Sequence, residues 1–165
     1  MKIVRVIICL GLLFTPGALA AGDRAGKNGE TGLPIPRFVS LRAAEVNMRA
    51  GPGREYKIMW VYLRRGLPME VVREFGHWRQ VREFSGESGW IRSNMLSGIA
   101  NVQVIAEIGT MHAEPATGSR LVARMERGVI AKLHDCEGEW CRIEAKDYEG
   151  WVNRAQVWGD ELEGD

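Results

Sequence analysis

The chain has 165 residues, of which 45% are hydrophobic and 26% are charged, a composition typical of a soluble globular protein. This length leaves room for one or two small domains and excludes a large multidomain enzyme. The formal net charge of +1 argues against nucleic acid as a partner, because binding by bulk electrostatics needs a strong basic excess.

The first twenty residues have the pattern of a cleavable signal peptide. Lys2 and Arg5 form a basic start, residues 3–14 are mainly apolar, and Ala18-Leu19-Ala20 fits the small-x-small site that signal peptidase reads. The apolar stretch is too short for a membrane span, which needs roughly 20 apolar residues. We therefore expect cleavage before Ala21, export to the periplasm or the exterior, and a mature chain without a membrane span.

An internal repeat organises the rest of the chain. Residues 21–36 contain four glycines and two prolines and show no regular apolar period, so we expect a flexible linker there. Beyond it, Gly76-His77-Trp78 returns as Gly138-Glu139-Trp140, and Gly89-Trp90-Ile91 returns as Gly150-Trp151-Val152. We place the first copy at 37–97, the second at 98–159 and an acidic tail at 160–165. Because almost no chain separates the copies, they should touch.

Each copy is predicted to be built from short strands. Segments rich in Val, Ile, Trp, Tyr and Phe alternate with Gly and Pro, a spacing typical of small barrels, and none keeps a helical apolar stripe for three turns. We expect an all-β fold of two tandem barrels, with short 3₁₀ turns at 93–96 and 154–157. The predicted strands are 38–42, 45–49, 58–63, 69–75, 78–84 and 89–92, then 101–106, 109–113, 120–125, 129–136, 140–145 and 149–152.

The first copy carries a family resemblance. It combines Asn47-Met48-Arg49-Ala50-Gly51-Pro52-Gly53 with Gly66, Gly76-His77-Trp78 and Gly89-Trp90-Ile91, and this combination resembles the bacterial SH3 (SH3b) domain. The second copy resembles the family more loosely, since Glu114 and Ala116 depart from its turn pattern. The resemblance covers nearly all of the mature chain. It implies two SH3-like barrels, the second degenerate, of a kind that exported bacterial proteins use as binding or targeting modules, often for cell-wall material.

Two cysteines of the second copy flank a four-residue turn. Facing residues of an antiparallel hairpin lie roughly 4.5 to 5.5 Å apart, within the reach of a disulfide, so we expect Cys136 and Cys141 to be bonded in an exported protein. The same positions of the first copy hold Glu74 and Arg79. Their opposite charges predict an ion pair across the equivalent hairpin.

The first copy is also the better match for an anionic ligand. Residues 37–97 hold eleven basic and six acidic residues. By strand alternation Trp78 faces outward. In the SH3 family that the first copy resembles, a Trp at this place lines the ligand groove, so the resemblance implies a groove lined by Trp78 and by Tyr56 of the long first loop. Arg side chains nearby would supply forked hydrogen bonds to carboxylates. The alternatives are packing of Trp78 against the other copy and an ordinary solvated surface. The candidate ligand-binding residues are Arg49, Arg54, Tyr56, Lys57, Arg64, Arg65 and Trp78.

These features predict a non-enzymatic binding or scaffolding module of the cell envelope. Its partner would be peptidoglycan, through the peptide stems, or an acidic segment of an envelope protein, and the sequence does not separate the two. The alternative is a wall hydrolase or amidase that uses Cys136 or Cys141 with a histidine. His112 and His134 lack the paired spacing of zinc ligands, so we expect no metal and no cofactor.

Overall fold

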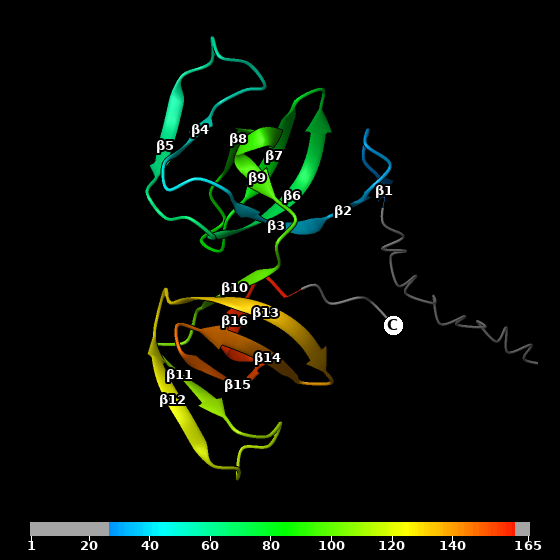
Figure 1. Cartoon of the computed structure of the whole chain (residues 1–165). Helices are drawn as coiled ribbons and strands as arrows, with labels where there is room; N and C mark the ends of the chain where they lie inside the picture. Colours follow the sequence, from blue (N-terminus) through cyan, green and yellow to red (C-terminus); the bar gives the residue numbers. More distant parts are fainter. Residues whose placement is uncertain (1–26, 161–165) are drawn as a thin grey trace, which may run out of the picture.

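The computed structural model describes residues 27–160 and contains two seven-stranded sheets, a two-stranded hairpin and two 3₁₀ turns. Each large sheet bends into a small barrel, and the barrels stack one above the other (Figure 1). The predicted all-β fold of two tandem barrels is therefore confirmed. Within residues 27–160 no helix has the length and apolarity needed to cross a bilayer. The predicted signal peptide, and the predicted tail beyond Asp160, lie outside the described residues.

Barrel 1 comprises β3 to β9 in the sheet order β5-β4-β8-β7-β6-β3-β9, and all of its strand pairs are antiparallel. Its core is aliphatic and methionine-rich, with Met48, Met69, Val71, Val81 and Ile91 fully buried. The elements are β3 (Arg37–Leu41), β4 (Val46–Arg49), β5 (Ile58–Tyr62), β6 (Pro68–Phe75), β7 (Trp78–Arg82), β8 (Ser88–Arg92), η1 (Ser93–Met95) and β9 (Leu96–Ser97).

Barrel 2 repeats this arrangement in β10 to β16, in the order β12-β11-β15-β14-β13-β10-β16. Met111, Ile143 and Val152 occupy the core positions that Met48, Val81 and Ile91 hold in barrel 1. The elements are β10 (Asn101–Val104), β11 (Ile108–His112), β12 (Leu121–Glu126), β13 (Ile130–Glu137), β14 (Trp140–Ala145), β15 (Tyr148–Asn153), η2 (Arg154–Gln156) and β16 (Val157–Trp158).

Every predicted strand is present, and β4, β7, β10 and β14 show the expected alternation of more and less buried residues. In β7, for example, Arg79 and Val81 are buried while Trp78 and Gln80 are half-buried on the other face. The sequence missed β9 and β16, which are two residues long and show no period of their own. Trp90 is buried in barrel 1, whereas Trp151, at the equivalent position of barrel 2, is half-buried.

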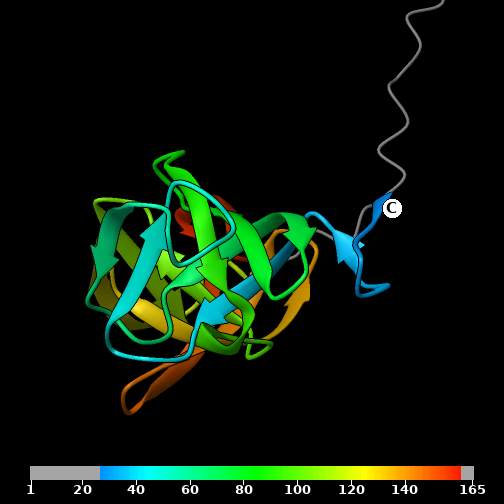
Figure 2. The same cartoon turned by 90° about the horizontal axis from the view of Figure 1, so that it is seen from above.

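Residues 27–36 differ from the expected flexible linker. β1 (Lys27–Asn28) pairs with β2 (Pro34–Ile35) in a small antiparallel hairpin, which Figure 2 shows to one side of barrel 1. Thr31 at its turn donates hydrogen bonds from its backbone N and its hydroxyl to the Glu74 carboxylate, at 2.8 and 2.9 Å. No local sequence pattern indicates this contact, because Glu74 lies 43 residues beyond Thr31 along the chain.

Glu74 is the centre of a buried network. It faces Arg79 across the β6–β7 hairpin, with Arg79 Nε 3.2 Å from Oε1, and Arg37 Nη2 lies 2.7 Å from the same oxygen. Burial opposes the charged form of this carboxylate, but the hydrogen bonds from Thr31 and Arg37 and the charge of Arg79 hold the pKa of Glu74 below its usual value. The predicted ion pair is confirmed, and it also fastens the N-terminal hairpin.

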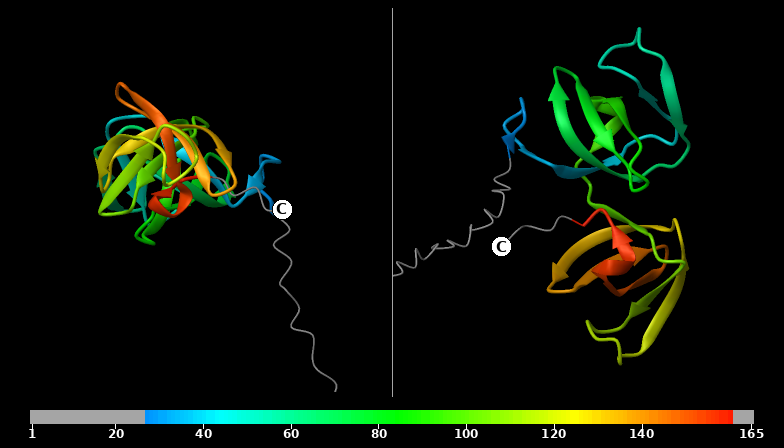
Figure 3. Two further views of the ribbon diagram at one scale, coloured as in Figure 1. Left: turned by 90° about the horizontal axis from the view of Figure 1, so that it is seen from below. Right: turned by 180° about the vertical axis from the view of Figure 1, so that it is seen from behind.

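The two barrels contact each other directly beside the short linker at residues 98–100. Asn101 Nδ2 donates to Ser40 Oγ and to the Gly66 carbonyl oxygen of barrel 1, each at 3.0 Å. Phe38 of β3 meets Trp158 of β16 edge to face, with ring centroids 4.9 Å apart. The rear view in Figure 3 shows the same stacking of the two barrels. Polar and aromatic contacts therefore hold the copies together, as the short linker predicts.

Candidate functional site

The first loop of barrel 1, residues 50–57, is braced from inside by one of the predicted ligand-binding residues. Arg49 Nη1 donates to the carbonyl oxygens of Arg54 and Tyr56 at 3.0 and 2.7 Å. Its guanidinium therefore holds the loop closed. Arg54, Tyr56 and Lys57 are exposed on that loop and stay candidates for ligand contact.

Gly51 is needed where the loop folds over itself. A Cβ at this position would lie 2.4 Å from Cδ1 of Tyr56, so any other residue would force the aromatic ring away from the backbone. Trp78 is half-buried at the start of β7, paired with Phe75 and Arg92 on the neighbouring strands. The predicted groove between Tyr56 and Trp78 stays a prediction.

Arg64 and Arg65 lie at the other end of β5. A five-residue strand is roughly 17 Å long, so the predicted basic cluster divides into two separate groups. Figure 1 shows the first loop pointing away from barrel 2 and the β5–β6 turn facing it. Arg64 Nη1 reaches across and donates to the Gly128 carbonyl oxygen of barrel 2 at 2.9 Å. The Arg64–Arg65 group therefore belongs to the junction of the barrels.

A groove of about 790 Å³ opens at that junction, which we call the inter-barrel groove. Barrel 1 contributes Arg64 and Arg65, and barrel 2 contributes the rest of the wall. Its charged residues are four bases and one acid, above a floor of methionine and aliphatic side chains. The lining residues are Arg64, Arg65, Met111, Ala123, Arg124, Met125, Glu126, Val129, Ile130, Ala145, Lys146 and Tyr148.

The bases of the inter-barrel groove are available to a ligand. Within residues 27–160, the side chains of Arg65, Arg124 and Lys146 form no ion pair, and all three are exposed. Tyr148 stands at the rim with 53% of its surface exposed. Sequence reasoning missed Arg124, Lys146 and Tyr148 because they lie in the second copy, where residues 98–159 hold nine acidic and seven basic residues. Only the stacking of the barrels brings them to Arg65.

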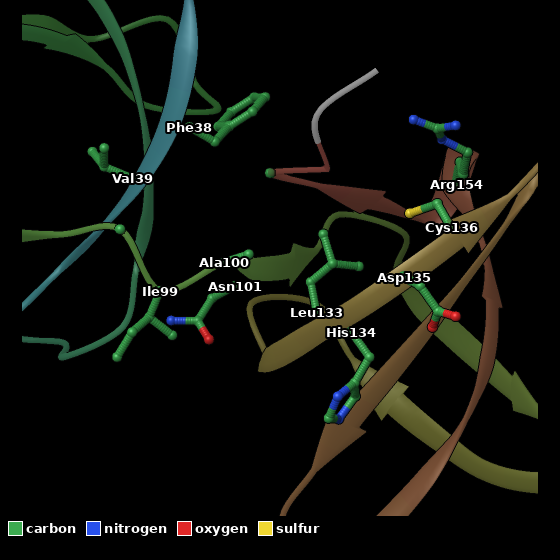
Figure 4. Close-up of a pocket in the computed structure, with 12 residues that line it drawn as sticks. Phe38, Val39, Ile99, Ala100, Asn101, Leu133, His134, Asp135, Cys136 and Arg154 are labelled. Carbon is green, nitrogen blue, oxygen red and sulfur yellow. The ribbon is translucent and has the colours of Figure 1, made fainter. Parts of the chain in front are cut away.

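A second cavity, of about 550 Å³, lies beside the linker. Figure 4 shows Phe38 and Val39 on its barrel 1 side and Leu133, His134 and Asp135 on its barrel 2 side. Its charged groups already have partners. His134 Nε2 lies 3.0 Å from a Glu144 oxygen, and Asp135 accepts a hydrogen bond from Arg142 at 2.8 Å. This cavity offers less unpaired charge to a ligand than the inter-barrel groove does.

Cys136 and Cys141 form the predicted disulfide, with Cα atoms 4.0 Å apart in paired positions of β13 and β14. A carboxylate oxygen of Asp160 lies within 4.8 Å of both sulfurs, but two sulfurs bonded to each other are not thiolate ligands for a metal. For the same reason neither sulfur is a nucleophile in this state, which argues against the alternative of a Cys–His pair at these positions. His112 hydrogen-bonds Ser119 and Thr110 and packs on Trp140.

A curated relative named "Putative N-acetylmuramoyl-L-alanine amidase YrvJ", from Bacillus subtilis (strain 168), is 26% identical over 147 residues, which is 77% of this chain and 28% of the relative. The chain therefore spans just over a quarter of that protein's length.

Two solved structures, NlpC2 and NlpC1 from Trichomonas vaginalis, are 13% and 14% identical to this chain. They cover 79% and 91% of it, and 50% and 54% of their own length. Their TM-scores of 0.37 and 0.36 are too low to carry an argument about fold or function.

The amidase relative corrects one expectation. The sequence predicted a protein that is not an enzyme, and a relative that carries the name of an amidase contradicts that prediction. That prediction weighed a Cys–His pair and the room for a catalytic domain beside two barrels in 165 residues, whereas the relative is much longer than this chain.

A family model described as Bacterial SH3 domain matches residues 42–98 and again residues 106–159. These are the two barrels that the strand order and the buried cores define. The protein belongs to the bacterial SH3 domain family, which it contains in two tandem copies.

Proposed function

We propose that this chain is a peptidoglycan-binding module that serves wall amidase chemistry, and that its inter-barrel groove holds the peptide stems. One observation carries the proposal: Arg65 of barrel 1 meets Arg124 and Lys146 of barrel 2 around one groove, without acidic partners among the described residues. Free cations at a concave surface favour an anionic ligand. This function implies that the protein is exported and associated with the cell wall.

The chemistry of the groove fits a peptide that carries carboxylates. Guanidinium groups bind carboxylates through two parallel hydrogen bonds, while an ammonium acts as a mobile point charge. The floor formed by Met111 and Met125 would hold short aliphatic side chains, because methionine adapts to irregular apolar surfaces. Tyr148 at the rim adds a flat apolar surface with a polar tip. The groove thus combines anion recognition with apolar contact.

The amidase relative supplies the reaction that this binding would serve. Its name identifies N-acetylmuramoyl-L-alanine as the substrate of that protein. A module that binds the wall keeps a linked catalytic unit close to its substrate, which raises the effective concentration of that unit. The module itself need not contact the bond that is cleaved. We therefore assign the barrels to substrate engagement within an amidase-type function.

Cosedimentation with purified sacculi tests the proposal. The variant Arg65→Glu with Arg124→Glu reverses one charge in each barrel and leaves Arg64, which also bonds Gly128, in place. We expect this variant to stay in the supernatant while the wild-type chain pellets. Arg42→Glu with Arg73→Glu is the matched control, because both are exposed bases outside the groove.

Undiminished pelleting of the groove variant would refute the groove as the wall site. A wild-type chain that fails to pellet would refute wall binding itself. Circular dichroism of each variant verifies that the barrels are folded.

A further inference from the structure

Strand β5 of barrel 1 is an edge strand with an unusual surface. It pairs with β4 on one side and with no strand of the described chain on the other. The sequence Ile58-Met59-Trp60-Val61 is between 40% and 48% exposed on both faces, and Leu63 is 71% exposed. Five large apolar side chains therefore stand in solvent beside an open row of backbone donors and acceptors.

Proteins normally protect such edges with charges or proline, because an open apolar edge is a template for another strand. Barrel 2 follows this rule. Its edge strand β12 pairs with β11 in the same way that β5 pairs with β4, and in that register Arg124 and Glu126 replace Val61 and Leu63. The same fold thus tolerates charges at these positions. The fold therefore does not require the apolar residues that barrel 1 has there.

The exposed strand is held in a fixed shape. Trp60 Nε1 donates to a Glu87 oxygen at 3.3 Å, and the Tyr62 hydroxyl donates to Met48 Sδ at 3.8 Å. Burial, with the nearby charges of Glu83 and Glu87, raises the pKa of Tyr62, so its hydroxyl stays a donor. A partner would therefore meet a preformed surface and lose little entropy in ordering it.

The charges of the segments that precede and follow β5 indicate the chemistry of its partner, while Glu83 and Glu87 lie beside Tyr62 and Trp60 within the strand. Arg54 and Lys57 precede the strand, with Glu55 as their only neighbouring acid in that segment, and Arg64 and Arg65 follow it. A second copy would pair by two-fold symmetry in antiparallel direction, which places the Lys57 end of one strand beside the Arg64 end of the other. Like charges would then oppose each other at both ends. An extended segment with an apolar centre and acidic residues at each end avoids this repulsion.

We propose that β5 is a docking edge for another protein, which adds an extended segment of this composition as an extra strand of barrel 1. Main-chain hydrogen bonds would supply affinity, and the apolar side chains of β5 would select the partner's central residues. The apolar part of this edge is distinct from the inter-barrel groove, which is lined by neither Val61 nor Trp60, while Arg64 and Arg65 at the end of the strand also line the groove. The chain would then engage the wall and a protein at separate surfaces.

The probe is a displayed library of random octapeptides, selected on the full chain. We expect the enriched peptides to have strand-forming apolar centres with Asp or Glu at both ends. Val61→Arg, which introduces the residue found at the equivalent position of barrel 2, should lower the affinity for these peptides by about tenfold or more. The matched control Leu121→Arg, on the edge strand of barrel 2, should leave their binding unchanged. Hydrogen exchange should slow at the amides of residues 58–62 when a peptide binds.

Several results would overturn the proposal. These are a selection without enrichment, peptides with basic ends, or peptides that bind Val61→Arg as well as they bind wild type. If sedimentation showed a dimer that Val61→Arg dissociates, the occupant of the edge would be a second copy of this chain and not another protein. Because Val61 does not line the inter-barrel groove, Val61→Arg should still pellet with the wall. Failure at the edge is therefore separable from failure of the groove.

Discussion

Lys146 adopts a left-handed backbone conformation, with φ of 54°, in the turn between β14 and β15. It is the only residue other than glycine with positive φ within residues 27–160. The equivalent turn of barrel 1 uses Gly86, whose φ is 93°. A side chain in this conformation costs about 1 kcal/mol, and such strain is found where function requires a particular side chain. Here the strained residue is a base at the inter-barrel groove.

Replacing Lys146 by glycine should move stability and binding in opposite directions. The glycine variant should be as stable as wild type or more stable, by up to about 1 kcal/mol in urea unfolding, because the strain is relieved. Its cosedimentation with sacculi should fall. Lys146→Arg, which keeps the charge, should retain binding. Equal binding by the glycine variant would contradict a role for Lys146 in the groove.

Glu74 makes the stability of barrel 1 depend on pH. Its folded-state pKa is lowered, so its ionised form stabilises the fold above its unfolded pKa. This contribution is lost as pH falls below about 4.5 and through the folded pKa.

Glu74→Gln should destabilise barrel 1 by about 3 kcal/mol at pH 7, since Arg37 and Arg79 keep their buried charges without a counter-charge. The difference in unfolding free energy between the variant and the wild type, measured in urea, should be smaller at pH 3. Glu107→Gln, at an exposed position, is the control and should change neither value. A difference that is equal at both pH values would show that the charge of Glu74 is not what stabilises the network.

At the scale of elements, the two copies fasten one hairpin by different means. β6 and β7 hold Glu74 opposite Arg79, and β13 and β14 hold Cys136 opposite Cys141 at the same positions. The repeat keeps the register while the chemistry of the pair changes.

Removing the disulfide should loosen barrel 2 and spare barrel 1. Closing a ring of six residues stabilises a fold by about 2 kcal/mol through the entropy of the unfolded chain. Cys136→Ser with Cys141→Ser should therefore lower the unfolding free energy of barrel 2 by about that amount, as monitored by hydrogen exchange of its core amides. Unchanged exchange in β13 and β14 would argue that the hairpin is held by its packing alone.

The strands and the paired hairpin positions could be predicted because they depend on local signals, namely alternation and glycine turns. The β1–β2 hairpin could not, since its anchor Glu74 is distant in sequence. The exposure of β5 could not either, because an apolar run such as Ile58-Met59-Trp60-Val61 is typical of a buried strand. The groove required the packing of one barrel on the other, which no local pattern encodes.

At the scale of the whole molecule, the junction between the barrels builds the groove. Asn101 bonds both Ser40 and Gly66, and Ser40 also donates to the Ile99 carbonyl oxygen at 2.8 Å. A glycine at 66 is required in this junction, because its φ is 82° and the Asn101 amide lies close by. The geometry of the linker therefore sets the distance between Arg65 and Arg124.

Lengthening the linker should abolish wall binding without unfolding either barrel. Inserting Gly-Ser-Gly-Ser after Gly98 lets the barrels separate, which divides the basic residues of the groove. We expect loss of cosedimentation with sacculi and a larger radius of gyration in solution scattering. The same insertion after Gly118, in an exposed loop of barrel 2, is the control and should still pellet. Retained binding after lengthening would place the wall site within a single barrel.

Because one hairpin is held by an ion pair and the other by a disulfide, the stabilities of the two barrels depend on different solution conditions. Protonation of Glu74 breaks its ion pair with Arg79 but leaves the disulfide of barrel 2 intact. A reductant cleaves the disulfide but leaves the ion pair of barrel 1 charged. A protein exposed to both acidification and reducing conditions outside the cytoplasm would thus keep one half locked under either stress. Duplication followed by divergence at a single pair of positions is sufficient to produce this tolerance.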